Sequence, residues 1–88
     1  MHEMGIASSV LEAVDKELHR YPGRHATKVG LRIGEFAGVD PESLLFCFDA
    51  IKKGTEFDQI ELEIEWREGS DQLDFVALEL EDANEVNV

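Results

Sequence analysis

Cysteine is nearly absent: Cys47 is the only one among the 88 residues. A single thiol cannot form an intramolecular disulfide, and it cannot supply the paired CxxC motifs of common structural zinc modules. The chain also has no apolar run long enough to span a membrane, and its first residues lack the basic and apolar pattern of a signal peptide. These absences predict a single-domain, soluble, cytoplasmic protein without structural zinc.

Basic residues are also scarce, with 8 Lys and Arg against 20 Asp and Glu, for a formal net charge of −12. The imbalance is concentrated in residues 45–88, which carry 3 basic and 13 acidic side chains. So much negative charge would repel both nucleic acid phosphates and anionic lipid. We therefore expect neither nucleic acid nor a membrane surface as a partner.

Motifs that would indicate an enzyme are missing. The chain has no phosphate-binding loop, no dinucleotide fingerprint and no serine flanked by glycines in a nucleophile elbow. Glu35, Glu63 and Glu65 remain as acid/base candidates by residue type alone, and a solvated sheet face is the more ordinary interpretation of strand glutamates. The sequence predicts a non-enzymatic protein.

Apolar spacing predicts two helices. Apolar residues recur at three- and four-residue intervals over 4–19, and Pro22 ends that segment. A second helix begins at Asp40-Pro41-Glu42, where Asp40 can cap free amides and Pro41 fits the first helical position. Its apolar stripe consists of Leu44, Cys47, Phe48 and Ile51. The stripe makes Cys47 a packed thiol rather than a reactive one.

Alternating polarity predicts three strands, at 27–34, 60–66 and 73–81. The residues expected to face the core are Val29, Leu31 and Ile33 on the first strand, Ile60, Leu62, Ile64 and Trp66 on the second, and Val76, Leu78 and Leu80 on the third. The helix between the first two strands favours a parallel pair, and the short turn after Trp66 favours an antiparallel hairpin of the last two. We expect an α/β two-layer sandwich, with a three-stranded mixed sheet and both helices on one face.

Like charges would crowd the outer face of this sheet, because glutamates alternate along the second and third strands. Lys28 and Arg32 on the first strand could relieve the repulsion if that strand lies beside an acidic one. The pattern alone leaves the strand order open. Residues 82–88 have few apolar anchors and are expected to form a loose tail.

The N-terminus contains the strongest chemical signal. A bulky second residue normally protects the initiator methionine, so the mature chain should begin with Met1, His2 and Glu3. The Met1 amine, the His2 amide and the His2 imidazole can close a five-membered and a six-membered chelate ring around one ion. Ni(II) and Cu(II) favour such in-plane nitrogen donors. Glu3 could add a carboxylate or its own amide, whereas His19 and His25 are expected at the surface.

The order of motifs resembles the HypA/HybF family of hydrogenase maturation proteins. The resemblance begins with Met1-His2-Glu3-Met4 and continues through the segments 29–35, 41–48 and 54–64. It implies a nickel metallochaperone in which His2 and Glu3 belong to the nickel site. It also implies partnership with a HypB-type GTPase and delivery of nickel to the hydrogenase large subunit.

One departure from the family is large. Family members carry a zinc-binding module with two CxxC pairs after the strand matching 60–66, whereas this chain has only a short turn at 67–72. Loop tips tolerate such changes, so residues 1–81 should still form one domain. The chain would then be either a natural zinc-less relative or an engineered excision. An alternative function is an interaction module that keeps partner binding and has lost metal transfer.

Overall fold

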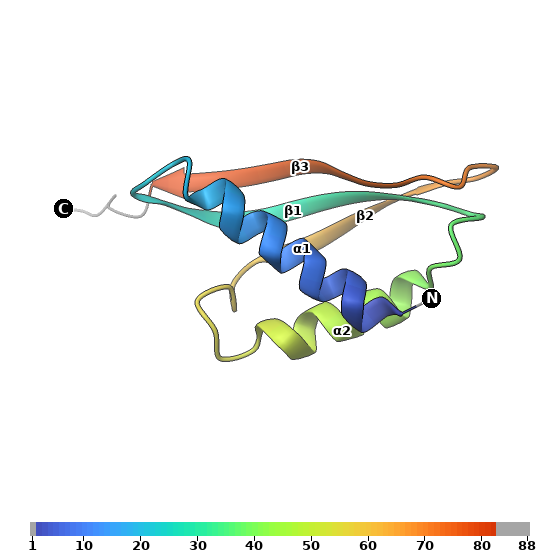
Figure 1. Ribbon diagram of the computed structural model, residues 1–88, viewed down its shortest axis with the longest axis horizontal. Helices are drawn as coiled ribbons and strands as arrows, with labels where there is room; N and C mark the ends of the chain where they lie inside the picture. Colours follow the sequence, from blue (N-terminus) through green and yellow to red (C-terminus); the bar gives the residue numbers. More distant parts are fainter. Residues whose placement is uncertain (1, 83–88) are drawn as a thin grey trace.

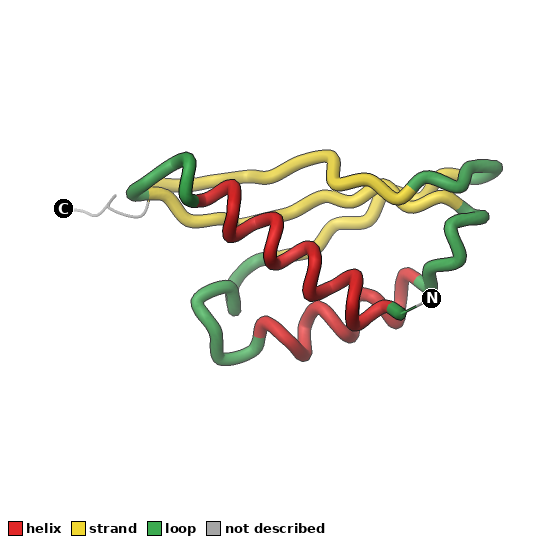
Figure 2. Tube along the Cα trace, viewed as in Figure 1, coloured by secondary structure: helices red, strands yellow, loops and turns green. Residues whose placement is uncertain are grey.

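The structure, a computed structural model, describes residues 2–82. Its elements follow the predicted order: α1 (Glu3–Leu18), β1 (Arg24–Gly34), α2 (Pro41–Lys52), β2 (Glu61–Arg67) and β3 (Leu73–Asp82). Both helices lie on the same side of the sheet, which confirms the two-layer α/β sandwich (Figures 1 and 2). None of the helices in the described range is long and apolar enough to cross a membrane.

The sheet has the order β2-β1-β3, with β2 parallel and β3 antiparallel to β1. The predicted parallel pair is confirmed, but the predicted hairpin between the last two strands is wrong, because β3 pairs with β1. A physical reason lies in the charges, since pairing β2 with β3 would set their glutamates against one another. With β1 in the centre, Lys28 Nζ lies 3.9 Å from Glu63 and Arg32 Nη2 lies 3.2 Å from Glu65.

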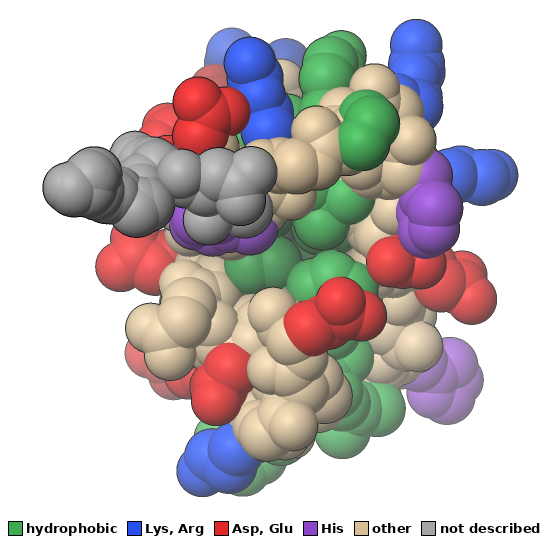
Figure 3. All heavy atoms as spheres, turned by 90° about the vertical axis from the view of Figure 1, so that its left-hand side faces the viewer, with side chains coloured by type: hydrophobic (Ala, Val, Ile, Leu, Met, Phe, Trp, Pro, Cys, Tyr) green, Lys and Arg blue, Asp and Glu red, His purple; other side chains and the backbone are tan. Residues whose placement is uncertain are grey.

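The core lies between the sheet and the helices. Its buried residues are Ala7, Val10, Val14, Ala26, Val29, Leu31, Ile33, Val39, Leu44, Phe48 and Ile60. Seen from one end, charged side chains lie around the periphery and hydrophobic ones show between the layers (Figure 3). The three core residues predicted for β1 are confirmed, while Cys47 is half-buried and packs against the core.

One predicted core residue of β3 is misplaced. A register shift between Gly30 and Leu31 sets Phe75 opposite Leu31, and Val76 remains 41% exposed. Trp66 at the end of β2 is likewise exposed. A bulge adds one residue to a strand, so the side chains beyond it point to the opposite faces of the sheet from those expected. Alternating polarity in the sequence does not reveal such a bulge.

The bounds of α1 and β2 and the end of β3 differ from the sequence-based expectation by one residue, and the start of β1 differs by three. β1 begins at Arg24, three residues before the predicted start at Thr27, because its first residues pair with the end of β3. Asp82 belongs to β3 and not to the predicted tail, since it is paired with Arg24 and its carboxylate lies 3.4 Å from that guanidinium. The rest of the predicted tail, 83–88, lies outside the described residues.

The segment 68–72 crosses the end of β1, since it joins strands on opposite sides of that strand (Figure 1). Gly34 N–H donates to Gln72 O (2.8 Å), and Phe36 N–H donates to Ser70 O (2.7 Å). The Glu35 carboxylate accepts from Gly69 N–H at 2.8 Å. The short turn is therefore fixed to β1 and to the loop that leads into α2.

Candidate functional site

His2 stands immediately before α1, in the N-cap position, and its side chain is exposed. Its carbonyl accepts from Ile6 N–H at 3.1 Å, and its imidazole makes no capping hydrogen bond. The first N–H groups of a helix have no acceptor within the helix. Within residues 2–82 the His2 ring therefore caps no helix amide, and it is exposed where a ligand can reach it.

Glu3 is held against the start of α2. Its Oε2 accepts from Asp40 N–H at 3.0 Å, and the start of α1 lies beside the start of α2 (Figure 1). This hydrogen bond is the largest cause that lowers the pKa of Glu3 below its ordinary value of 4.5. The Glu3 side chain is thus an anionic acceptor that joins the two helix N-termini.

Asp40 is the N-cap of α2, as predicted. Its Oδ1 accepts from Glu42 N–H at 3.1 Å, and its Oδ2 accepts from the Ser43 hydroxyl at 3.0 Å. Pro41 occupies the first helical position, where the missing N–H would have no partner. Both carboxylate oxygens of Asp40 therefore serve α2, and its backbone N–H is left for Glu3.

The other histidines lie apart from this end. His19 Nδ1–H donates to the Asp15 carbonyl at 2.8 Å, and His25 Nε2 lies 3.7 Å from the Glu81 carboxylate. Among residues 2–82, no three His, Cys, Asp or Glu side chains gather as a metal site would require. Met1, the other predicted contributor, lies outside the described residues.

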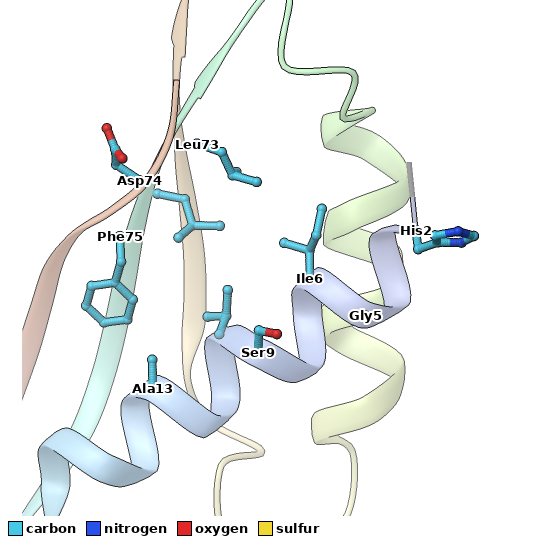
Figure 4. Close-up of a pocket in the computed structure, with 10 residues that line it drawn as sticks. His2, Gly5, Ile6, Ser9, Ala13, Leu73, Asp74 and Phe75 are labelled. Atoms are coloured by element: carbon cyan, nitrogen blue, oxygen red, sulfur yellow. The ribbon is translucent and has the colours of Figure 1, made fainter. Parts of the chain in front are cut away.

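An open apolar groove of about 480 Å³ runs between α1 and β3 beside His2. Figure 4 shows Ile6, Leu73 and Phe75 along it, while the His2 ring points away from β3. Walls of this kind offer few donors for a metal ion. The sequence did not indicate the groove, because the bulge that turns Phe75 towards α1 is invisible in the alternating pattern of β3.

Glu63 and Glu65, the two strand glutamates considered as acid/base candidates, are engaged in ion pairs. Glu65 accepts from Arg32 at 3.2 Å and from Arg67 at 2.8 Å, and these hydrogen bonds, Arg32 first, lower the pKa of Glu65. A general acid working near neutral pH needs a raised pKa, so the shift is in the wrong direction. The arrangement gives no support to acid/base chemistry on this face.

Comparison with known proteins identifies relatives. The family model described as hydrogenase/urease nickel incorporation, metallochaperone, HypA matches residues 1–72. The hydrogenase maturation factor HypA of Chlorobaculum tepidum is 48% identical over 69 residues, which cover 78% of this chain and 61% of the relative. The HypA of Geobacter sp. strain M21 is 49% identical over 65 residues, covering 74% and 56%. The chain thus spans less than two thirds of the length of these relatives.

A solved structure shares the fold. The solution structure of the Ni metallochaperone HypA from Helicobacter pylori superimposes with a TM-score of 0.69 at 14% identity, covering 97% of this chain and 91% of that one. This likeness extends through most of the described elements and is evidence for architecture alone. With the family model matched over most of its length, the chain belongs to the HypA family of nickel-incorporation proteins.

Proposed function

We propose that this chain is a nickel-binding metallochaperone domain that acts in maturation of nickel-iron hydrogenase and has no catalytic step of its own. The observation that carries the proposal is the exposed His2 before α1, whose ring makes no capping hydrogen bond within the described residues, in a chain of the HypA family. Relatives with 46–49% identity are named hydrogenase maturation factors.

The proposed nickel site consists of the Met1 amine, the His2 amide and the His2 imidazole, with Glu3 adjacent. Square-planar Ni(II) favours a nitrogen-rich set of this kind. Deprotonating the His2 amide breaks no helical hydrogen bond, because an amide before the first turn has no acceptor in the helix. Bound Ni(II) would be the cargo, and His2 would contribute most to holding it since both its side chain and backbone coordinate.

Partners follow from the family. We propose that a HypB-type GTPase acts with this domain, that the hydrogenase large subunit receives the nickel, and that the transfer takes place in the cytoplasm. Structural zinc is not part of the proposal, because Cys47 is the only thiol and it packs against the core. Residues 1–81 would act as one domain, with the turn at 67–72 in the place of a zinc module.

Nickel titration by calorimetry tests the site. We would compare protein with its native, untagged N-terminus, a form with one extra N-terminal residue, and the His2→Ala variant, with His25→Ala as the matched control. We expect one nickel bound by the native protein and by His25→Ala, and loss of tight binding in the other two. Equal affinity in the native and extended proteins would refute the amine-based site.

An interaction module is the second candidate, and the apolar groove beside His2 favours it, since apolar concave surfaces suit protein contacts. Binding of a purified HypB-type GTPase would be measured with and without nickel, using native protein and His2→Ala. Metallochaperone function predicts that nickel changes the affinity for native protein only. Identical affinity in all four measurements, with no nickel bound, would favour the interaction module.

A further inference from the structure

Glu3 has a second possible role at the proposed nickel site besides that of a ligand. Its carboxylate is already an acceptor for Asp40 N–H at 3.0 Å, a contact between residues 37 positions apart. We propose that the Glu3 carboxylate is a positioning group, which fixes the N-terminal chelate to the start of α2 and does not coordinate nickel. This inference rests on the proposed function.

Among the described residues, the acceptor found for the Asp40 N–H is the Glu3 carboxylate. Asp40 precedes α2, so its N–H takes no part in the helical hydrogen bonds, and the Asp40 side chain is occupied by Glu42 N–H and the Ser43 hydroxyl. A hydrogen bond to an ionised carboxylate is about twice as strong as one between neutral groups.

The position of Glu3 in the chain allows its hydrogen bond with Asp40 to restrain the proposed nickel chelate. Glu3 is the first residue of α1 and directly follows His2, so a bond at Glu3 restrains the segment that would carry the metal. Helix ends otherwise fray, and a frayed segment must lose conformational entropy when it closes around an ion. Groups that orient metal ligands through hydrogen bonds typically change metal affinity by about 10–100-fold.

The two roles predict different behaviour of a Glu3→Ala variant. If the carboxylate only positions the chelate, we expect about 10-fold weaker nickel binding at unchanged stoichiometry, with the same visible absorption spectrum of bound Ni(II). If the carboxylate coordinates, the spectrum must change because one donor is lost. Glu3→Gln keeps an oxygen acceptor for Asp40 N–H and is expected to restore most of the affinity.

The experiment uses the native N-terminus and three variants: Glu3→Ala, Glu3→Gln and Glu12→Ala, the last at an exposed glutamate on the same helix. Calorimetry and absorption are measured with nickel, and hydrogen exchange of the Asp40 amide is measured without it. We expect faster Asp40 exchange and weaker nickel binding in Glu3→Ala, near-native values in Glu3→Gln, and no change in Glu12→Ala.

Three results would overturn the inference: an altered nickel spectrum in Glu3→Ala, native Asp40 exchange in that variant, or native nickel affinity. Failure of the proposed function is separately visible. In that case the native protein binds no nickel at its N-terminus, and the positioning role falls with it, although faster Asp40 exchange in Glu3→Ala would still demonstrate the hydrogen bond.

Discussion

Replacing Gly34 with alanine should destabilise the fold through a backbone collision. A Cβ atom at this position would lie 2.8 Å from the Gln72 amide nitrogen, and it would lie closer still to the Ser70 carbonyl group. Real Cβ atoms essentially never come so near, and backbone cannot rotate aside as a flexible side chain can. Relief therefore requires moving the whole turn away from the end of β1.

The expected loss in unfolding free energy can be estimated from the contacts that this movement of the turn disturbs. Overpacking a fitted site typically costs about 1–3 kcal/mol. Shifting the turn also weakens the Gly34–Gln72 and Phe36–Ser70 hydrogen bonds, each worth about 1 kcal/mol. We expect Gly34→Ala to lower the free energy of unfolding by about 3 kcal/mol. A domain of this length has about 4–13 kcal/mol in total, so the loss is easily detected.

Urea unfolding followed by Trp66 fluorescence measures the effect, with Gly69→Ala as the matched control. Gly69 lies in the same turn with a φ of 71°, and a Cβ there would meet nothing within 4 Å. Its substitution costs only the left-handed backbone strain, about 1 kcal/mol. A transition midpoint for Gly34→Ala equal to or above that of Gly69→Ala, at unchanged slope, would refute the steric reasoning.

Three further predictions concern the core, the ion pairs and the helix cap. Phe48→Ala removes a fully buried ring and should cost about 3–5 kcal/mol in thermal unfolding, so a loss below about 1 kcal/mol would contradict its place in the core. Arg32→Gln removes the main cause of the lowered Glu65 pKa, which should rise towards 4.5 in an NMR titration; an unchanged value would exclude the pair. Because the folded-state pKa of Glu65 is lowered, its carboxylate stabilises the fold above pH 4.5. The difference in unfolding free energy between native protein and Glu65→Gln should therefore shrink as the pH falls below 4.5 and through the folded-state pKa of Glu65. Asp40→Ala should cost about 1 kcal/mol and Asp40→Asn only a few tenths in urea unfolding, and equal losses would argue against the cap.

Local signals explain why α2 was predictable and the sheet order was not. Asp40, Pro41 and Gly54 mark the two ends of α2 with their own backbone preferences, so a single sequence suffices. Strand order depends instead on which strands pair once the whole chain has folded. Here it is favoured by ion pairs such as Arg32–Glu65, which join residues that are distant in sequence.

In the candidate site, too, local sequence signals indicate some features, whereas contacts between distant residues remain hidden in the sequence. His2 could be named as a candidate ligand from the sequence because its position after the initiator methionine is itself the chemical feature. The engagement of Glu3 was not recognisable, because its partner is a backbone N–H in a loop 37 residues away and no side-chain pattern marks such a donor. The shift of Phe75 to the helix side was hidden for a related reason, since bulges leave no trace in alternating polarity.

The central place of β1 has a consequence for the order in which the protein can fold. Both strands that flank β1 are synthesised after it, and β3 is the last element of the described chain. Until β3 has left the ribosome, one whole edge of β1 has no strand to pair with, and a two-stranded sheet is marginally stable at best. Contacts between such distant segments slow folding, because loops must close before the contacts form. The nascent domain should therefore stay open to chaperones until synthesis of β3 is complete.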